Sequence, residues 1–234
     1  MTNVDGEHLS EIATQWTLLA RAHRHDGDER EAAFAELLPR YCRAIAQYLR
    51  RLVGDTGAMD LSQEFALRFL RGEFRHADPS RGRFRDYVKA SAIYMAMAYR
   101  KKVAKHAHDR LTPVDPPAPA ADDDAAFRQL WRSDVLSRTW VALEQASQSK
   151  GDLRSAVLNA KADRPEASSE QIADALSAST GQKISVDNVR QLMHRAREKF
   201  AELLRAEVAA TLPGSDAAEV DQELAELGLL KYCR

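Results

Sequence analysis

The sequence contains little cysteine, little glycine and no long hydrophobic run. Its two cysteines, Cys42 and Cys233, are far apart among 234 residues, which argues against a structural disulfide and fits a reducing cytoplasm. Only 10 glycines and few β-branched residues accompany abundant Ala, Leu, Arg and Glu, which favours helices over strands. No apolar stretch approaches the ~18 residues that cross a bilayer, and no secretion signal opens the sequence. We therefore expect an all-α, cytoplasmic protein without a membrane partner.

The net charge of −1 is unevenly distributed along the chain. Lys and Arg outnumber Asp and Glu between Arg30 and His108, whereas acidic residues concentrate in residues 115–124 and 216–226. A basic block inside a nearly neutral chain can still form a local phosphate-binding surface. The alternative interpretation is a basic helical face that is merely solvated.

Hydrophobic spacing divides the chain into four parts. Apolar residues at three- and four-residue spacing predict helices within residues 1–108, interrupted at residues 54–57 and 76–82. The segment TPVDPPAPAADDDAA, residues 112–126, has almost nothing to bury, so we predict a flexible acidic, Pro-rich linker over 109–126. A second helical domain is expected over 127–212, and an acidic amphipathic tail over 213–234.

The second domain contains a predicted helix-turn-helix. Ser168 and Gln171 have the spacing of a helix N-cap, and a supporting helix would follow over 169–176. A recognition helix would begin at Ser185, although the segment SASTGQKI, residues 177–184, is longer than a tight turn. The polar and basic residues of that helix are the candidate DNA-binding residues: Asn188, Arg190, Gln191, His194, Arg195 and Arg197.

Four sequence motifs, in order, carry a resemblance to a known family. They are FAELLPRY at residues 34–41, DLSQEF at 60–65, DPSRGRFRDYV at 78–88 and ISVDNVRQLMHRAR at 184–197. The first three resemble region two, and the last resembles region four, of the extracytoplasmic-function (ECF) sigma factors of bacterial RNA polymerase. The resemblance covers both helical domains and implies a promoter-recognition subunit with no enzymatic activity of its own.

The resemblance also implies roles for individual residues. Asp60, Gln63 and Glu64 would dock on core RNA polymerase from one helical face. Residues Arg81, Arg83, Arg85 and Tyr94, with Lys89 as a weaker candidate, would contact the melted non-template strand of the minus-ten element. Tyr87 and Tyr94 lie seven residues apart, so they form a stacking surface or belong to the core. The family usually has asparagine where this chain has Tyr94, so the identity of the extruded base does not carry over.

Other chemistry finds little support in the sequence. Glycine-rich phosphate loops, CxxC pairs and HExxH motifs are absent, so we expect no cofactor, no metal and no catalytic residue. The expected partners are core RNA polymerase, duplex and melted promoter DNA, and an anti-sigma factor or other regulator. A free-standing helix-turn-helix regulator and an adaptor that has lost DNA binding are the alternatives. The aspartates of the linker would mimic nucleic acid inside the polymerase or serve as a soluble spacer.

Overall fold

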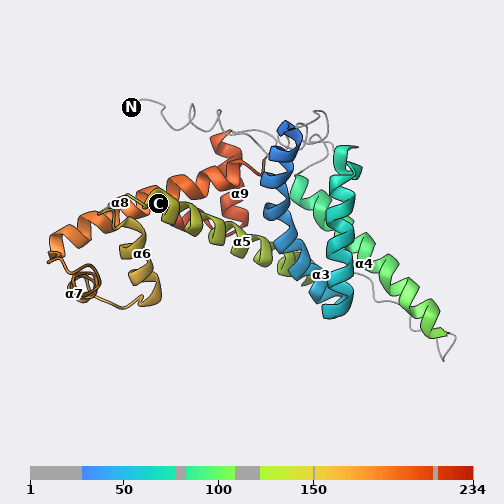
Figure 1. Ribbon diagram of the computed structural model, residues 1–234, viewed down its shortest axis with the longest axis horizontal. Coiled ribbons are helices and arrows are strands. Elements are labelled where there is room, and N and C mark those ends of the chain that lie inside the picture. Colours follow the sequence, from blue (N-terminus) through green and yellow to red (C-terminus); the bar gives the residue numbers. More distant parts are fainter. Residues whose placement is uncertain (1–27, 77–82, 109–121, 150, 213–215, 234) are drawn as a thin grey trace. The chain divides into compact units, whose positions relative to one another are not determined.

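In the computed structural model, residues 28–76, 83–108, 122–149, 151–212 and 216–233 are described (Figure 1). Over these ranges the chain forms seven α-helices and two short 3-10 helices and contains no strand, which confirms the all-α prediction. No described helix is both long and apolar enough to span a membrane. The elements are α3 (Asp28–Leu70), η1 (Glu73–His76), α4 (Phe84–His108), α5 (Asp122–Ala146), α6 (Arg154–Asp163), α7 (Ser169–Thr180), α8 (Val186–Ala209), α9 (Ala217–Glu226) and η3 (Leu230–Tyr232).

The interruption expected at residues 54–57 is a single-residue kink within α3. Gly54 has φ 78° and ψ 175°, a left-handed conformation that costs a glycine little and other residues more. The helix resumes at once, so Gly57 lies inside it. A Cβ atom at Gly57 would lie 2.7 Å from Cε1 of Tyr99, so this glycine allows α4 to approach α3 closely.

The described chain divides into two compact units. The first comprises the chain up to Asp134 together with Ala209–Val220. In it α3 and α4 lie side by side (Figure 1) around a core of aromatic rings. The ring centroids of Tyr41 and Phe84 are 5.0 Å apart, and those of Phe65 and Phe74 are 5.1 Å apart. Tyr41 and Phe65 follow the apolar spacing that predicted α3, whereas Phe74 lies in η1.

The start of α5 also belongs to the first unit. The ring centroid of Phe127 lies 5.0 Å from that of Tyr48, and the ring centroid of Trp131 lies 5.4 Å from that of Tyr41. The sequence pattern predicts Phe127 and Trp131 in the second domain, because the apolar stripe of α5 continues without a break into residues that lie there. A hydrophobic pattern gives the buried face of a helix but not the partner that covers it.

The predicted linker, residues 109–126, overlaps the first turn of α5. Residues 109–121 lie outside the described residues, but residues 122–126 are helical, so the linker prediction is wrong for them. The physical reason is local. The last proline of the segment is Pro119, so no ring blocks helical hydrogen bonds from Asp122 onward. Aspartates in the first turn also interact favourably with the positive end of the helix dipole.

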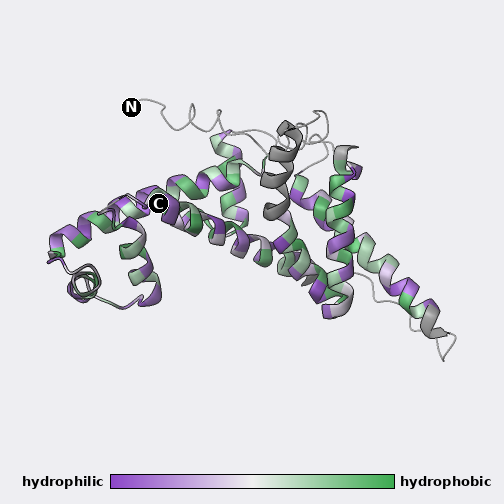
Figure 2. Ribbon diagram, in the orientation of Figure 1, coloured by the Kyte–Doolittle hydropathy of each residue, from purple (hydrophilic) through white to green (hydrophobic). Residues whose placement is uncertain are grey.

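The second unit comprises Val135–Val208 and Asp221–Arg234. Helices α6, α7 and α8 enclose a core of aliphatic residues, and their ribbons alternate between apolar and polar segments in Figure 2. The core residues are Val157, Ile172, Ala173, Leu176, Ile184, Val189 and Ala196. Trp140 of α5 packs against Phe200 of α8, with ring centroids 5.0 Å apart.

The predicted cap of the supporting helix is confirmed. The Ser168 hydroxyl accepts a hydrogen bond from the backbone N–H of Gln171, and the Gln171 side chain accepts one from the backbone N–H of Ser168. At its other end α7 continues to Thr180 and terminates at Gly181 with φ 69°. The connection to α8 is consequently residues 181–185, shorter than the enlarged turn expected from the sequence. The expectation was wrong because residues 177–180 add a further helical turn to α7.

The acidic tail forms the helix that its apolar spacing predicted. Residues 213–215 lie outside the described residues, and α9 follows them. Leu224, Leu227 and Leu229 are buried. In the second unit, an ion pair of 2.6 Å joins Arg205 of α8 to Asp221 of α9. This part of the tail is thus a packed element.

Candidate protein and nucleic-acid interfaces

The residues of the DLSQEF motif alternate between core and surface along α3. Leu61 and Phe65 are 4% and 1% exposed and face the aromatic core. Asp60, Gln63 and Glu64 are exposed and share one face, as their spacing of three and four residues requires. Glu64 accepts a hydrogen bond from Nε of Arg68 at 3.0 Å, and the pair is solvent-accessible. The motif thus presents carboxylate and amide groups on a helix anchored by its apolar positions.

Two apolar side chains on the same face were not found by sequence reasoning. Met59 is 61% exposed and Leu67 is 49% exposed. At 100° per residue, Leu67 projects between Gln63 and Glu64 on the helical wheel, so the polar residues surround an apolar centre. An apolar centre with a polar rim is the arrangement of protein–protein interfaces. A helical wheel drawn for α3 alone would have revealed it, since no core position accommodates Leu67.

A shallow hollow of about 320 Å³ borders this face where α3 meets α4. Asp60, Glu64 and Arg68 contribute from α3, and Tyr99 and Lys102 contribute from α4. We name the exposed residues Met59, Asp60, Gln63, Glu64 and Leu67 the α3 face. A side chain of a binding partner could insert into this hollow at the edge of the α3 face.

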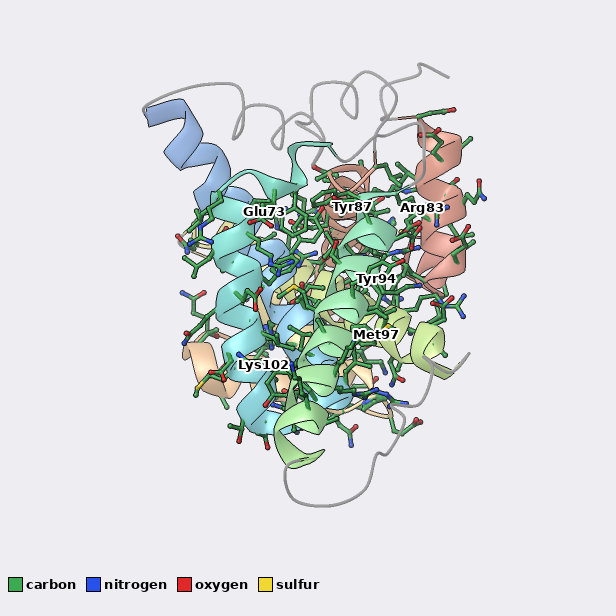
Figure 3. All side chains as sticks on the ribbon, turned by 90° about the vertical axis from the view of Figure 1, so that its right-hand side faces the viewer. Glu73, Arg83, Tyr87, Tyr94, Met97 and Lys102 are labelled. Carbon is green, nitrogen blue, oxygen red and sulfur yellow. The ribbon has the colours of Figure 1, made fainter. Side chains whose placement is uncertain are left out.

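An exposed aromatic stripe runs along α4. Tyr94 is 72% exposed, and Tyr87 and Met97 are 38% and 43% exposed. Figure 3 looks onto this helix and shows the three residues following one another along it. Lys101 lies seven residues beyond Tyr94 and is also exposed, so two rings are followed by a positive charge on one helical face. Rings that offer a face to solvent beside cations suit stacking of unpaired bases.

The two interpretations of Tyr87 both describe part of its environment. One side of its ring packs on the core, with its centroid 5.9 Å from that of Phe74 and 6.2 Å from that of Phe84. The remainder is open to solvent. Tyr94 has no such packing partner among the ring contacts of the described residues, so it is the better placed of the two rings to stack on a base.

The arginines expected near single-stranded DNA differ in position. Arg81 lies outside the described residues. Arg83 immediately precedes α4 and is partly exposed. Arg85 is only 5% exposed, so its side chain is not open to a phosphate in this structure, and its role in contacting DNA stays a prediction. Arg85 lies in the first turn of α4 and turns towards the core, whereas Arg83 lies before the helix.

Lys89 is engaged by the start of α5. Its ammonium group forms an ion pair with a carboxylate oxygen of Asp124. That hydrogen bond and the charge of Lys89, with smaller contributions from Arg128 and Arg85, hold the pKa of Asp124 below its ordinary value. Because the predicted linker residue Asp124 lies at the basic side of α4, a phosphate that approaches Lys89 would compete with this carboxylate.

The six candidate residues of α8 are all exposed: Asn188, Arg190, Gln191, His194, Arg195 and Arg197. The opposite side of the helix carries Val189 and Ala196 into the core of the unit. The Ser185 hydroxyl accepts a hydrogen bond from the backbone N–H of Asn188 at 3.2 Å, which fixes the start of the helix. The sequence therefore identified both the beginning of α8 and its open face.

Two basic side chains on this face have acidic neighbours on the same helix. Arg190 pairs with Asp187 at 3.1 Å, and Nε2 of His194 lies 3.7 Å from a carboxylate oxygen of Glu198. All four side chains are more than half exposed, so these contacts contribute little to stability and exchange readily for an external partner.

Among the described residues, no group of three or more His, Cys, Asp and Glu side chains could hold a metal ion. No protein-family model, curated protein or solved structure matches this chain.

Proposed function

We propose that this protein is a sigma factor that directs bacterial RNA polymerase to promoters and assists DNA melting. The observation that carries the proposal is the alternation within DLSQEF on α3. The positions that the resemblance assigns to the polymerase are exposed, whereas Leu61 and Phe65 are buried.

The chemistry of the α3 face indicates the kind of polymerase surface that it fits. Asp60 and Glu64 call for a basic partner, while Met59 and Leu67 offer apolar area. Charges at a rim mainly set the rate and orientation of encounter, and the desolvated apolar centre contributes most of the affinity. Core binding is thus expected to depend on Leu67 as well as on the acidic residues.

Promoter contacts are divided between two helices. On α4, Tyr94 would stack on an unpaired base of the non-template strand, and Arg83 would contact an adjacent phosphate. On α8, Asn188, Arg190 and Gln191 stand in the first two turns, where side chains of a recognition helix reach base edges in the major groove. The basic residues further along, Arg195 and Arg197, would contact the backbone and fix the register.

A regulator that occupies the α3 face or the α4 stripe would prevent promoter binding. An anti-sigma factor is the partner that the resemblance implies for this role. Such a protein would cover Leu67 or Tyr94, the side chains that now expose apolar surface to solvent.

Co-purification with core RNA polymerase tests the proposal. Glu64→Lys should weaken core binding about tenfold or more while the helical circular dichroism spectrum is retained, because a charge reversal at a rim position is repelled by a basic partner. The matched control is Glu144→Lys, which makes the same charge change at an exposed position of α5 outside the α3 face. Equal core binding by Glu64→Lys and wild type would contradict the docking assignment.

Experiments on the wild-type protein alone distinguish the sigma factor from the alternative, a free-standing helix-turn-helix regulator. A sigma factor should retain core polymerase and support promoter-dependent transcription with it. A free-standing regulator should instead bind its duplex operator at the same affinity whether or not core polymerase is present, and should not co-purify with it.

A further inference from the structure

A second hollow, of about 390 Å³, lies where α6 and α7 meet α8. Its polar lining consists of Lys161, Ser169, Arg190, His194 and Arg197. No carboxylate lines it, whereas carboxylates line the hollow beside residues 151–154, on the opposite side of α8, and the hollow beside the α3 face. The lining therefore combines two guanidinium groups, an ammonium group and an imidazole around one space.

Lys161 is the residue that the sequence pattern did not single out. It lies in the last turn of α6, and its Nζ atom donates a hydrogen bond of 2.9 Å to the backbone carbonyl oxygen of Ala167. This bond ties the ammonium group to the residues just before α7 and uses one of its three protons. The remaining protons are available to a ligand in the hollow.

The beginning of α7 adds to the positive potential. Ser169 is the first residue of that helix and lines the hollow, so the positive end of the helix dipole lies beside it. The Glu170 carboxylate lies in the first turn of the same helix. Its pKa is lowered chiefly by the hydrogen bond from the Ser168 hydroxyl, and to a smaller extent by the charge of Arg190.

We propose that this hollow is a clamp for one backbone phosphate of duplex DNA, with Lys161 as its positioning residue. This inference rests on the proposed function and describes how α7 and α8 would be held against the major groove of the DNA. A phosphate seated between Lys161 and Arg197 sits against the side of α8 that also carries Arg190 and His194. Lys161 thereby fixes the depth and rotation of α8 without reading a base.

The test measures equilibrium binding of holoenzyme to a promoter fragment at several salt concentrations. Lys161→Gln should weaken binding roughly three- to tenfold on every promoter sequence and reduce the salt slope by about one, because one fewer counterion is released. Lys161→Arg keeps the charge and should restore both quantities. The matched control is Lys231→Gln, at an exposed lysine of η3 outside the hollow, which should bind as wild type does.

A fragment truncated to remove the upstream duplex element supplies the second comparison. Lys161→Gln and wild type should bind it equally, because α8 then has no duplex to engage. An unchanged salt slope, equal weakening on the truncated fragment, or failure of Lys161→Arg to restore binding would each overturn the clamp.

Failure of the proposed function gives a different pattern, since wild-type protein would then confer no promoter binding on core polymerase. In that case the free full-length chain is titrated with duplex DNA, and the same three variants are compared. Loss of binding and of one unit of salt slope in Lys161→Gln alone would support the clamp, and equal binding by all variants would overturn it.

Discussion

The two units hold their exposed helices in place through different kinds of contact. In the first, α3 and α4 are held by large aromatic rings, among them Phe65, Phe69 and Phe84, that fit against one another. In the second, the α6–α8 core consists of smaller aliphatic side chains, and the helix termini are fixed by local hydrogen bonds at Ser168 and Ser185. The first unit thus depends on packing between helices, and the second depends in addition on capping and turn geometry.

This difference suits what each unit presents. The α3 face and the α4 stripe are long helical surfaces, whose positions are kept by a broad core. The direction of α8 depends on the connection at residues 181–185. There the backbone N–H of Ile184 donates a hydrogen bond of 2.9 Å to the Ser177 hydroxyl, and Ile184 itself is buried in the core. A substitution that alters this connection would change the direction of α8 without unfolding the unit.

The largest expected effect is the loss of an aromatic ring from the first core. Phe65→Ala should reduce the free energy of unfolding of this unit by about 3–5 kcal/mol, since it removes a fully buried ring and leaves a cavity. Hydrogen exchange read separately for α3 and α7 amides measures it, and α7 protection should change little. Equal loss of protection in both helices would show that the two cores unfold together, which would contradict the view that each unit is stabilised separately.

Overpacking provides the second test. Gly57→Ala should destabilise the first unit, because the new methyl group would meet the end of the Tyr99 side chain and displace its ring; alanine's higher helix propensity, worth about 1 kcal/mol, offsets part of the roughly 1–3 kcal/mol that overpacking costs. The double variant Gly57→Ala with Tyr99→Leu serves as the control and should lose less on adding the methyl group, as measured by urea unfolding. A methyl group that costs the same in both backgrounds would contradict the assigned contact.

The cap of α7 should contribute less to stability than either packing contact. Ser168→Ala should cost about 1 kcal/mol, the usual loss for an N-cap hydroxyl, while Ser168→Asp should remain close to wild type because aspartate also caps. Thermal unfolding followed by circular dichroism measures both. A loss of equal size in the two variants would mean that the hydroxyl contributes through something other than capping.

The smallest expected effect is the pH dependence of two aspartates, one in each unit. Hydrogen bonds from Arg154 lower the pKa of Asp152, and Lys89 lowers that of Asp124. A lowered folded-state pKa gives stability that is present above the unfolded value of about 3.9 and is lost as the pH falls through the folded-state value.

Replacing each aspartate with asparagine removes the part of the stability that depends on the charge of that carboxylate. The Asp152→Asn change should have the larger effect, since the Asp152 side chain is 16% exposed and that of Asp124 is 61% exposed and screened by solvent. Unfolding at pH 7 and below pH 4 measures both variants. A larger pH-dependent effect from Asp124→Asn would reverse the expected order.

Helical periodicity, caps and charge spacing were sufficient to predict the helical class, the Ser168 cap, the start of α8 near Ser185 and its exposed residues. These features depend on residues close in sequence, where hydrogen bonds and the 3.6-residue period act directly. The same local rules predicted that Asp60, Gln63 and Glu64 share a face.

Only the tertiary structure decided which surfaces meet. It buried Arg85, paired Lys89 with Asp124, packed Phe127 and Trp131 against Tyr48 and Tyr41, and brought Lys161 to the side of α8. Each of these depends on residues distant in sequence. A hydrophobic stripe states that a face will be covered, but the covering surface is selected by the shape and charge of all the elements together.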